Sequence, residues 1–412
     1  MLLVRCHRSR HKVVSSAVLF TLRRGEVVST LFVRERLIRL ITQRVYCSVE
    51  CLRNHWPEHK KECGKTDRIS LESFYPFLAY MWSSAHQHRS KPMHPALLHQ
   101  IVNDVNPSAP TTHLPDGWEA KLVMIDDTSP VRITGDNMRD WFPLSYSDSV
   151  ATKLSQRIMS EGYVLPIATS IATSLLVEMY TTTSGSESER RRIRLKYRSS
   201  PIADFGIVSG SVPVIPNDRL AYYKMSNGEI FRGQDPDDHY WIYFTSIRGE
   251  QVLLDCAMFT FNLCEMIFAT PYIPPAAAGR HHLITVPAFF SGREIRKNTP
   301  PLYHERKRMS ILRDPALHEA VKQFEFDDDG LSLAELSPFF QFMEKLSGRG
   351  LRQDERALFA ELVKMHCDDV ADVLGHSSWQ QYPEAPQIAI FGDPGELQDS
   401  DDRAEEWARR NL

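Results

Sequence analysis

A short segment near the N-terminus, residues 46–63, contains three cysteines and two histidines, of which one histidine shares a regular spacing with the cysteines. These four residues are Cys47, Cys51, His59 and Cys63, in a Cys-x3-Cys-x7-His-x3-Cys spacing. Thiolates and imidazoles are the ligands that structural zinc sites use, so this spacing predicts zinc binding. Residues four apart on a helix point to the same face, so Cys47 with Cys51 and His59 with Cys63 each form one ligand pair.

The two ligand pairs are expected to face different directions. His59 lies eight positions after Cys51, which corresponds to a rotation of roughly 80° on an ideal helix, and Pro57 interrupts the run. Two zinc ions, one for each pair, are therefore a more natural arrangement than a single ion.

The segment resembles the C-terminal half of a MYND zinc finger. The residues that carry the resemblance are Tyr46, Cys47, Ser48, Cys51, Trp56, His59 and Cys63. In that family two Cys-x2-Cys pairs come first, and the four ligand pairs interleave on two zinc ions. The resemblance implies that Cys47 and Cys51 serve one zinc, that His59 and Cys63 serve the other, and that Trp56 is a packing aromatic.

The resemblance also implies a function. MYND fingers are protein-interaction modules, and some bind short proline-containing peptides; here that surface would involve Trp56. Some MYND proteins carry a SET methyltransferase domain, but its Asn-His-Ser-Cys core and Gly-Glu-Glu ending are not found in this sequence. The chain therefore resembles the MYND proteins without SET, many of which are fungal.

The first half of the finger has no counterpart in the sequence. Two tetrahedral sites need eight ligands, and residues 1–45 offer Cys6, His7 and His11 but no Cys-x2-Cys pair. Three explanations follow: a half-finger that binds one distorted zinc or none, a site completed by Cys6 and a histidine, or residues 25–43 that are not genuine coding sequence. We favour the third, although Leu31 to Tyr46 can also be interpreted as a helix.

Composition indicates an ordinary globular protein of two to three domains. The chain has 412 residues, of which 42% are hydrophobic and 25% charged, and its net charge of -3 provides no field that would recruit nucleic acid. No apolar run approaches the ~18 residues that span a bilayer. Of the seven cysteines, three lie in the finger and the other four are scattered, which favours a reducing compartment, hence the cytoplasm or nucleus. The basic residues 1–25 resemble a mitochondrial presequence, which is a minor alternative.

The predicted fold class is α+β, with a small zinc finger joined to a larger mixed domain. The expected organisation is a basic N-terminal segment (1–45), the finger (46–63), an α+β domain (70–270), a mainly helical region (280–392) and an acidic tail (393–412). Periodicity and capping signals predict helices at 70–87, 96–105, 147–160, 166–180, 315–324, 333–346 and 354–374. Alternation and turn signals predict strands at 118–125, 192–198, 219–225, 229–233, 240–247 and 251–255. Asn227-Gly228 predicts a hairpin of the strands 219–225 and 229–233.

A second candidate site is the pair of His239 and Asp255. A hairpin turning at Arg248-Gly249 would bring them together, and a histidine oriented by a carboxylate is the general-base half of a catalytic triad. The two strands resemble the pair in transglutaminase-like and papain-like folds. The resemblance gives the helix 166–180 the nucleophile position, but this helix carries no cysteine, so a degenerate, non-catalytic version is favoured over a hydrolase or acyltransferase. A structural histidine at a strand edge is favoured over both.

Three further patterns are explained without special chemistry. The basic run 190–198 alternates with apolar residues, which indicates a half-buried strand and disfavours a nucleic-acid contact. The cluster Asp327 to Gly330 lacks the glutamate that an EF-hand needs at its twelfth position, so calcium is disfavoured. His366 and Cys367 are adjacent on a predicted helix and diverge by roughly 100°, which disfavours a shared metal.

Overall fold

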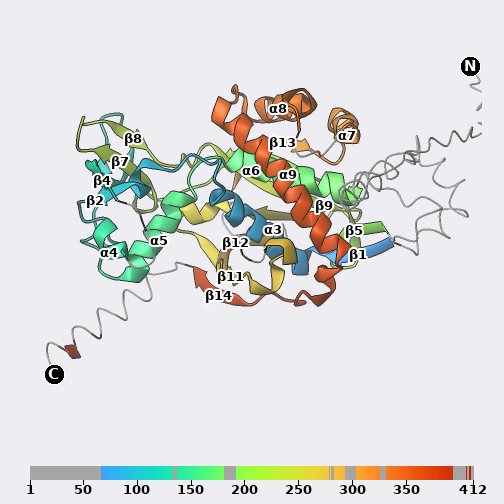
Figure 1. Ribbon diagram of the computed structural model, residues 1–412, viewed down its shortest axis with the longest axis horizontal. Coiled ribbons are helices and arrows are strands. Elements are labelled where there is room, and N and C mark those ends of the chain that lie inside the picture. Colours follow the sequence, from blue (N-terminus) through green and yellow to red (C-terminus); the bar gives the residue numbers. More distant parts are fainter. Residues whose placement is uncertain are drawn as a thin grey trace, which may run out of the picture.

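The computed structural model describes residues 66–392 except 132, 134–136, 181–191, 278, 280–282, 293–302 and 325–330, together with 405, 408 and 409. The fold is α+β, as predicted: a main body built on a large sheet, with a smaller lobe at one end (Figure 1). The strands of the main body are β1 (Thr66–Ser70), β5 (Arg192–Tyr197), β6 (Ser200–Ser211), β9 (His239–Ser246), β10 (Gln251–Asp255), β11 (Cys264–Phe268), β12 (Thr285–Gly292), β13 (His304–Ser310) and β14 (Ile388–Gly392).

The large sheet runs in the order β1-β5-β6-β9-β10-β12-β11-β14, with β13 also paired to β6. Its pairings are antiparallel except for β1 with β5. On the edge of β6 that does not face β9, β5 covers the first residues and β13 covers the last. Strands β12, β13 and β14 come from the region 280–392, so the boundary predicted at residues 271–279 cuts across this sheet.

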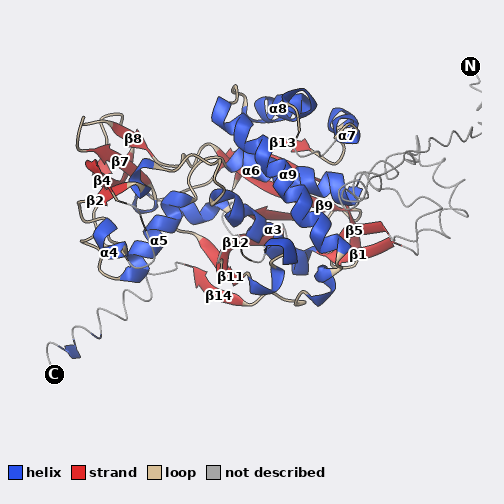
Figure 2. Ribbon diagram, viewed as in Figure 1, coloured by secondary structure: helices blue, strands red, loops and turns tan. Residues whose placement is uncertain are grey.

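Helices cover the large sheet in two layers (Figure 2). The helices of the main body are α3 (Leu71–His86), α6 (Val164–Leu175), α7 (Pro315–Lys322), α8 (Leu333–Ser347) and α9 (Gln353–Gly375). Helix α6 packs on β6 and β9 and is covered by α9, and α3 packs on β12 beside it. Every residue of α6 is buried, which explains why its sequence is apolar on all faces.

The smaller lobe has its own sheet and its own core. Its elements are β2 (His99–Ile101), β3 (Thr112–His113), β4 (Glu119–Pro130), α4 (Met138–Trp141), α5 (Asp148–Met159), β7 (Leu220–Lys224) and β8 (Ile230–Arg232). The strand order is β2-β4-β7-β8, with β3 also on β4. A separate cluster of buried side chains, which includes Trp141, Ile158 and Tyr222, fills the space between this sheet and the two helices.

Capping signals located several helices to within a residue or two. Asp314 accepts hydrogen bonds from the first amides of α7, and Ser332 with Glu335 forms the capping box of α8. The helix predicted at 96–105 is wrong. The structure has a short 3₁₀ turn there, η1 (Pro95–Leu97), followed by β2, because pairing with β4 overrides local propensity.

Among the described residues no single helix is long and apolar enough to cross a membrane. Helix α5 and the segment Val164–Tyr180 reach that length only as a pair, across a bend of 75°.

Candidate functional site

The predicted zinc ligands Cys47, Cys51, His59 and Cys63 lie outside the described residues, as do Trp56 and the acidic cluster at Asp327. Two residues separate Cys63 from β1, so the candidate finger is attached directly to an edge strand of the large sheet. Thiols and imidazoles, the donors of these two ligand pairs, are the donor types that structural zinc sites use. The residue types therefore fit zinc.

The described part of the chain offers no competing metal site. No group of three or more His, Cys, Asp or Glu side chains there could hold a metal ion. Cys256 and Cys367 are both buried within the main body, where Cys367 belongs to the hydrophobic core around α9. Any zinc that this protein holds through such a cluster must therefore involve residues outside the described part.

The hairpin of β9 and β10 brings His239 and Asp255 together, as predicted. Their strands pair antiparallel, and His239 Nε2 lies 2.6 Å from Asp255 Oδ2. Both side chains have an exposed fraction of 0%. Asp255 Oδ1 also accepts hydrogen bonds from the amides of Ala257 (2.9 Å) and Met258 (3.2 Å), so this one carboxylate ends β10 and begins the next 3₁₀ turn.

The surroundings of His239 are aromatic. The rings of Trp241, Phe261 and Tyr303 lie 5.8–6.4 Å from the imidazole, centroid to centroid. His239 Nδ1 has no hydrogen-bond partner among the described residues. A general base must reach the proton that it removes, and here the second nitrogen is enclosed by rings. The chemistry that this arrangement supports directly is a buried structural link between β9 and β10.

The sequence did not reveal a second buried histidine contact, between Ser170 of α6 and His366 of α9. Ser170 Oγ lies 3.0 Å from His366 Nδ1, while His366 Nε2 lies 3.3 Å from the carbonyl oxygen of Met81 in α3. One imidazole therefore links three helices. Ser170 and His366 are both fully buried, and the partners are 196 and 285 residues apart, so no local pattern indicates them.

The third buried polar site surrounds Glu161, which follows α5. Tyr222 Oη donates a hydrogen bond of 2.8 Å to Glu161 Oε1, and His94 Nε2 lies 3.7 Å from Oε2. Burial raises the pKa of Glu161 to about 7, although Tyr222, Arg157 and Lys91 each lower it. Burial also lowers the pKa of Lys91 to about 8 and that of His94 to about 3. Several titratable groups with shifted pKa values lie together here, and such a cluster is a candidate for a functional site.

The strand expected in the basic run is confirmed as β5. Leu195 and Tyr197 are buried, whereas Arg194 and Lys196 are partly exposed on the opposite face. The guanidinium of Arg194 lies 5.1 Å from the ring centre of Tyr180, and that of Arg198 lies 3.9 Å from Glu250. These contacts are typical of a half-buried strand with a polar outer face.

Comparison with known proteins identifies the N-terminal segment. Residues 42–63 match the family model described as the MYND finger. No curated protein and no solved structure matches the chain. The matched range contains the cysteines, the histidine and the tryptophan of the predicted site, and MYND fingers bind zinc. The chain therefore carries a MYND-type zinc finger at residues 42–63, with zinc as its cofactor.

Proposed function

We propose that this protein works as a zinc-dependent interaction factor, in which the finger binds a partner protein and the α+β body carries it. The observation that supports this proposal is the MYND finger match at residues 42–63. Fingers of this type are generally protein-interaction modules. The proposed site of action is the cytoplasm or nucleus.

In this proposal Cys47, Cys51, His59 and Cys63 hold the metal. A module of this size cannot build a hydrophobic core that outweighs its loss of chain entropy, so zinc ligation supplies the folding free energy. Cys47 with Cys51 and His59 with Cys63 act as two pairs, and Cys6 or a nearby histidine is the candidate for any further ligand. Metal binding and partner binding are then coupled, because the binding surface exists only in the folded finger.

The proposed partner is a short proline-containing peptide in another protein, held against Trp56. A proline-rich segment is already extended and loses little entropy on binding, and aromatic side chains provide the flat apolar surface that it contacts. Nucleic acid and membrane surfaces are not proposed as partners.

The test uses the full-length chain and fluorescein-labelled proline-containing peptides, measured by anisotropy. We expect saturable binding that is lost in Trp56→Ala and in Cys63→Ser, and that disappears when a chelator removes zinc. Trp379→Ala is the matched control, because it removes a tryptophan at the far end of the chain. Binding that survives both finger variants would contradict the proposal.

A second candidate function, a hydrolase or acyltransferase, is supported by the 2.6 Å contact between His239 and Asp255. Helix α6 packs against β9. The proposal takes it as the counterpart of the nucleophile helix of a transglutaminase-like or papain-like fold, although it carries no cysteine. The test is hydrolysis of activated esters and thioesters by the wild-type chain and by His239→Ala. Turnover that depends on His239 would favour this function, and its absence would leave the interaction factor.

A further inference from the structure

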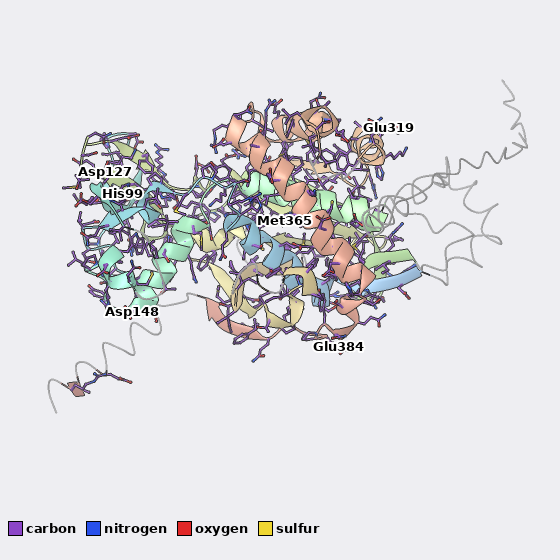
Figure 3. The ribbon with its side chains drawn as sticks, viewed as in Figure 1. His99, Asp127, Asp148, Glu319, Met365 and Glu384 are labelled. Atoms are coloured by element: carbon purple, nitrogen blue, oxygen red, sulfur yellow. The ribbon has the colours of Figure 1, made fainter. Side chains whose placement is uncertain are left out.

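The chain passes between the main body and the smaller lobe four times. The connections are residues 87–94 after α3, 160–163 between α5 and α6, 212–219 between β6 and β7, and 233–238 between β8 and β9. Figures 1 and 3 show the lobe at one end of the main body, where Figure 3 labels His99, Asp127 and Asp148. The contacts that hold the four connections together therefore contribute to how firmly the lobe is attached.

Three of the four connections meet at the carboxyl group of Glu161. Glu161 lies in the second connection, and His94 of the first lies 3.7 Å from its Oε2. Gly233 of the fourth lies so close that a Cβ there would be 2.7 Å from Glu161 Oε1. The side chain of Gln234, also in the fourth, accepts a hydrogen bond of 2.9 Å from the amide of Gly162, next to Glu161.

The remaining connection is held by Arg157, one helical turn before Glu161. Its Nη2 donates to the carbonyl oxygen of Asp218 at 2.7 Å, and its Nε donates to that of Thr260, in the main body, at 3.1 Å. The lobe contributes its own contact to the same centre, because Tyr222 of β7 donates from its hydroxyl to Glu161. Arg157 and Glu161 together thus bind all four connections.

The titratable and charged groups around the Glu161 carboxyl come from three elements. Facing Glu161 are Arg157 from α5, Lys91 and His94 from the first connection, and Tyr222 from β7. His94 Nδ1 accepts a hydrogen bond from the amide of Ala96, so the neutral ring carries its proton on Nε2, toward Glu161. Glu161 has an exposed fraction of 7%, and placing a negative charge at such a site costs free energy.

We propose that Glu161 is a proton-controlled latch between the two lobes: its neutral carboxyl group keeps the four connections closed, and its ionisation loosens them. The direction of this effect follows from the thermodynamic linkage between proton binding and closure of the junction. A carboxyl group whose pKa is about 7 when buried, against an ordinary value of 4.5, holds its proton more tightly in the closed junction. With these two values, Glu161 alone lowers the closed-to-open ratio about tenfold between pH 6 and pH 8. His94 and Lys91 act in the opposite direction, because burial lowers the pKa of each.

Hydrogen–deuterium exchange of the full chain at pH 6, 7 and 8 tests this proposal, with protection factors corrected for intrinsic exchange. We expect the ratio of wild-type protection to Glu161→Gln protection in residues 87–98 and 233–238 to fall about tenfold from pH 6 to pH 8. His94 and Lys91, whose pKa values burial lowers, are present in both proteins, so their contributions cancel in this ratio. Glu229→Gln, which removes an exposed carboxylate paired with Lys224 at 2.7 Å, should behave like the wild type.

A second variant separates titration from a purely structural role. Tyr222 lowers the pKa of Glu161 through its hydrogen bond, so Tyr222→Phe should shift the fall in protection to higher pH without abolishing it. The same pH dependence of protection in the wild type and in Glu161→Gln, or a fall relative to Glu161→Gln that is unshifted in Tyr222→Phe, would each overturn the proposal.

Discussion

The buried pair of His239 and Asp255 permits a quantitative prediction. Replacing Asp255 by Ala leaves three buried donors without their acceptor: the imidazole N–H of His239 and the amides of Ala257 and Met258. Breaking a fully buried pair by removing one partner costs about 3–5 kcal/mol, and each orphaned buried donor costs about 1–3 kcal/mol. We therefore expect Asp255→Ala to lower the free energy of unfolding by about 4 kcal/mol.

Asp255→Asn should cost less, about 2 kcal/mol. The amide oxygen can still accept from the two backbone amides, but the amide nitrogen is a donor and faces His239 Nε2. The imidazole must then move its proton to Nδ1, which has no hydrogen-bond partner among the described residues. The cost is that of one orphaned buried donor, about 1–3 kcal/mol.

Denaturant unfolding, with an unchanged m value as the check on the comparison, measures these costs. Asp237→Ala is the matched control, because Asp237 is exposed and lies two residues before His239; it should stay within about 0.5 kcal/mol of the wild type. A cycle with His239→Ala should give a coupling energy of about 2 kcal/mol. A cost below about 1 kcal/mol for Asp255→Ala, or no coupling, would refute the reasoning.

Three further perturbations have expected outcomes. Gly206→Ala should lower the free energy of unfolding by about 3 kcal/mol, because its Cβ would lie 2.1 Å from the carbonyl oxygen of Met309. Gly350→Ala is the control, because the space around Gly350 is open, and it should have little effect in the same thermal melts. The free energy of unfolding of the wild type, measured relative to that of Glu161→Gln, should fall by about 3 kcal/mol from below pH 4.5 to above pH 7, because burial raises the pKa of Glu161 to about 7. Parallel denaturant titrations of the two proteins measure this difference, in which the opposite contribution of the buried His94 cancels. His366→Leu should lower the free energy of unfolding by about 2 kcal/mol in denaturant titrations, because it removes the contacts of the imidazole with Ser170 and with the carbonyl of Met81. An effect no larger than that of His376→Leu, at an exposed histidine, would contradict this prediction.

Local signals in the sequence were sufficient for elements that local chemistry determines. The Asn227-Gly228 turn predicted the hairpin of β7 and β8, and the Arg248-Gly249 turn predicted that of β9 and β10. Because the second hairpin was predicted, the approach of His239 to Asp255 was predicted as well. The zinc finger could be identified for the same reason, since its ligands lie within eighteen residues of one another.

Strand β6 was missed because its glycines indicate turns when the sequence is considered alone. In the structure Gly206 and Gly210 have a different role: they let β13 pass so close that a Cβ at either position would lie 2.1–2.3 Å from a β13 carbonyl oxygen. Strand β13 was missed too, because its residues are mostly charged and do not alternate. Its position depends on pairing with β6, about a hundred residues away, which no local window contains.

The two buried sites that the sequence did not reveal share this property. Glu161 meets Tyr222 across 61 positions, and Ser170 meets His366 across 196. Neither residue belongs to a recognisable motif, and each gains its importance from burial, which only the assembled fold determines.

The central claim, that a MYND-type finger at residues 42–63 holds zinc through Cys47, Cys51, His59 and Cys63, is tested most directly by metal analysis of the purified chain. The wild type and a Cys47→Ser/Cys63→Ser variant are compared after gel filtration. We predict zinc in the wild type, two ions if residues before Tyr46 complete both sites and one if they do not, and its loss from the variant. No zinc in the wild type, or equal zinc in both proteins, would contradict the claim.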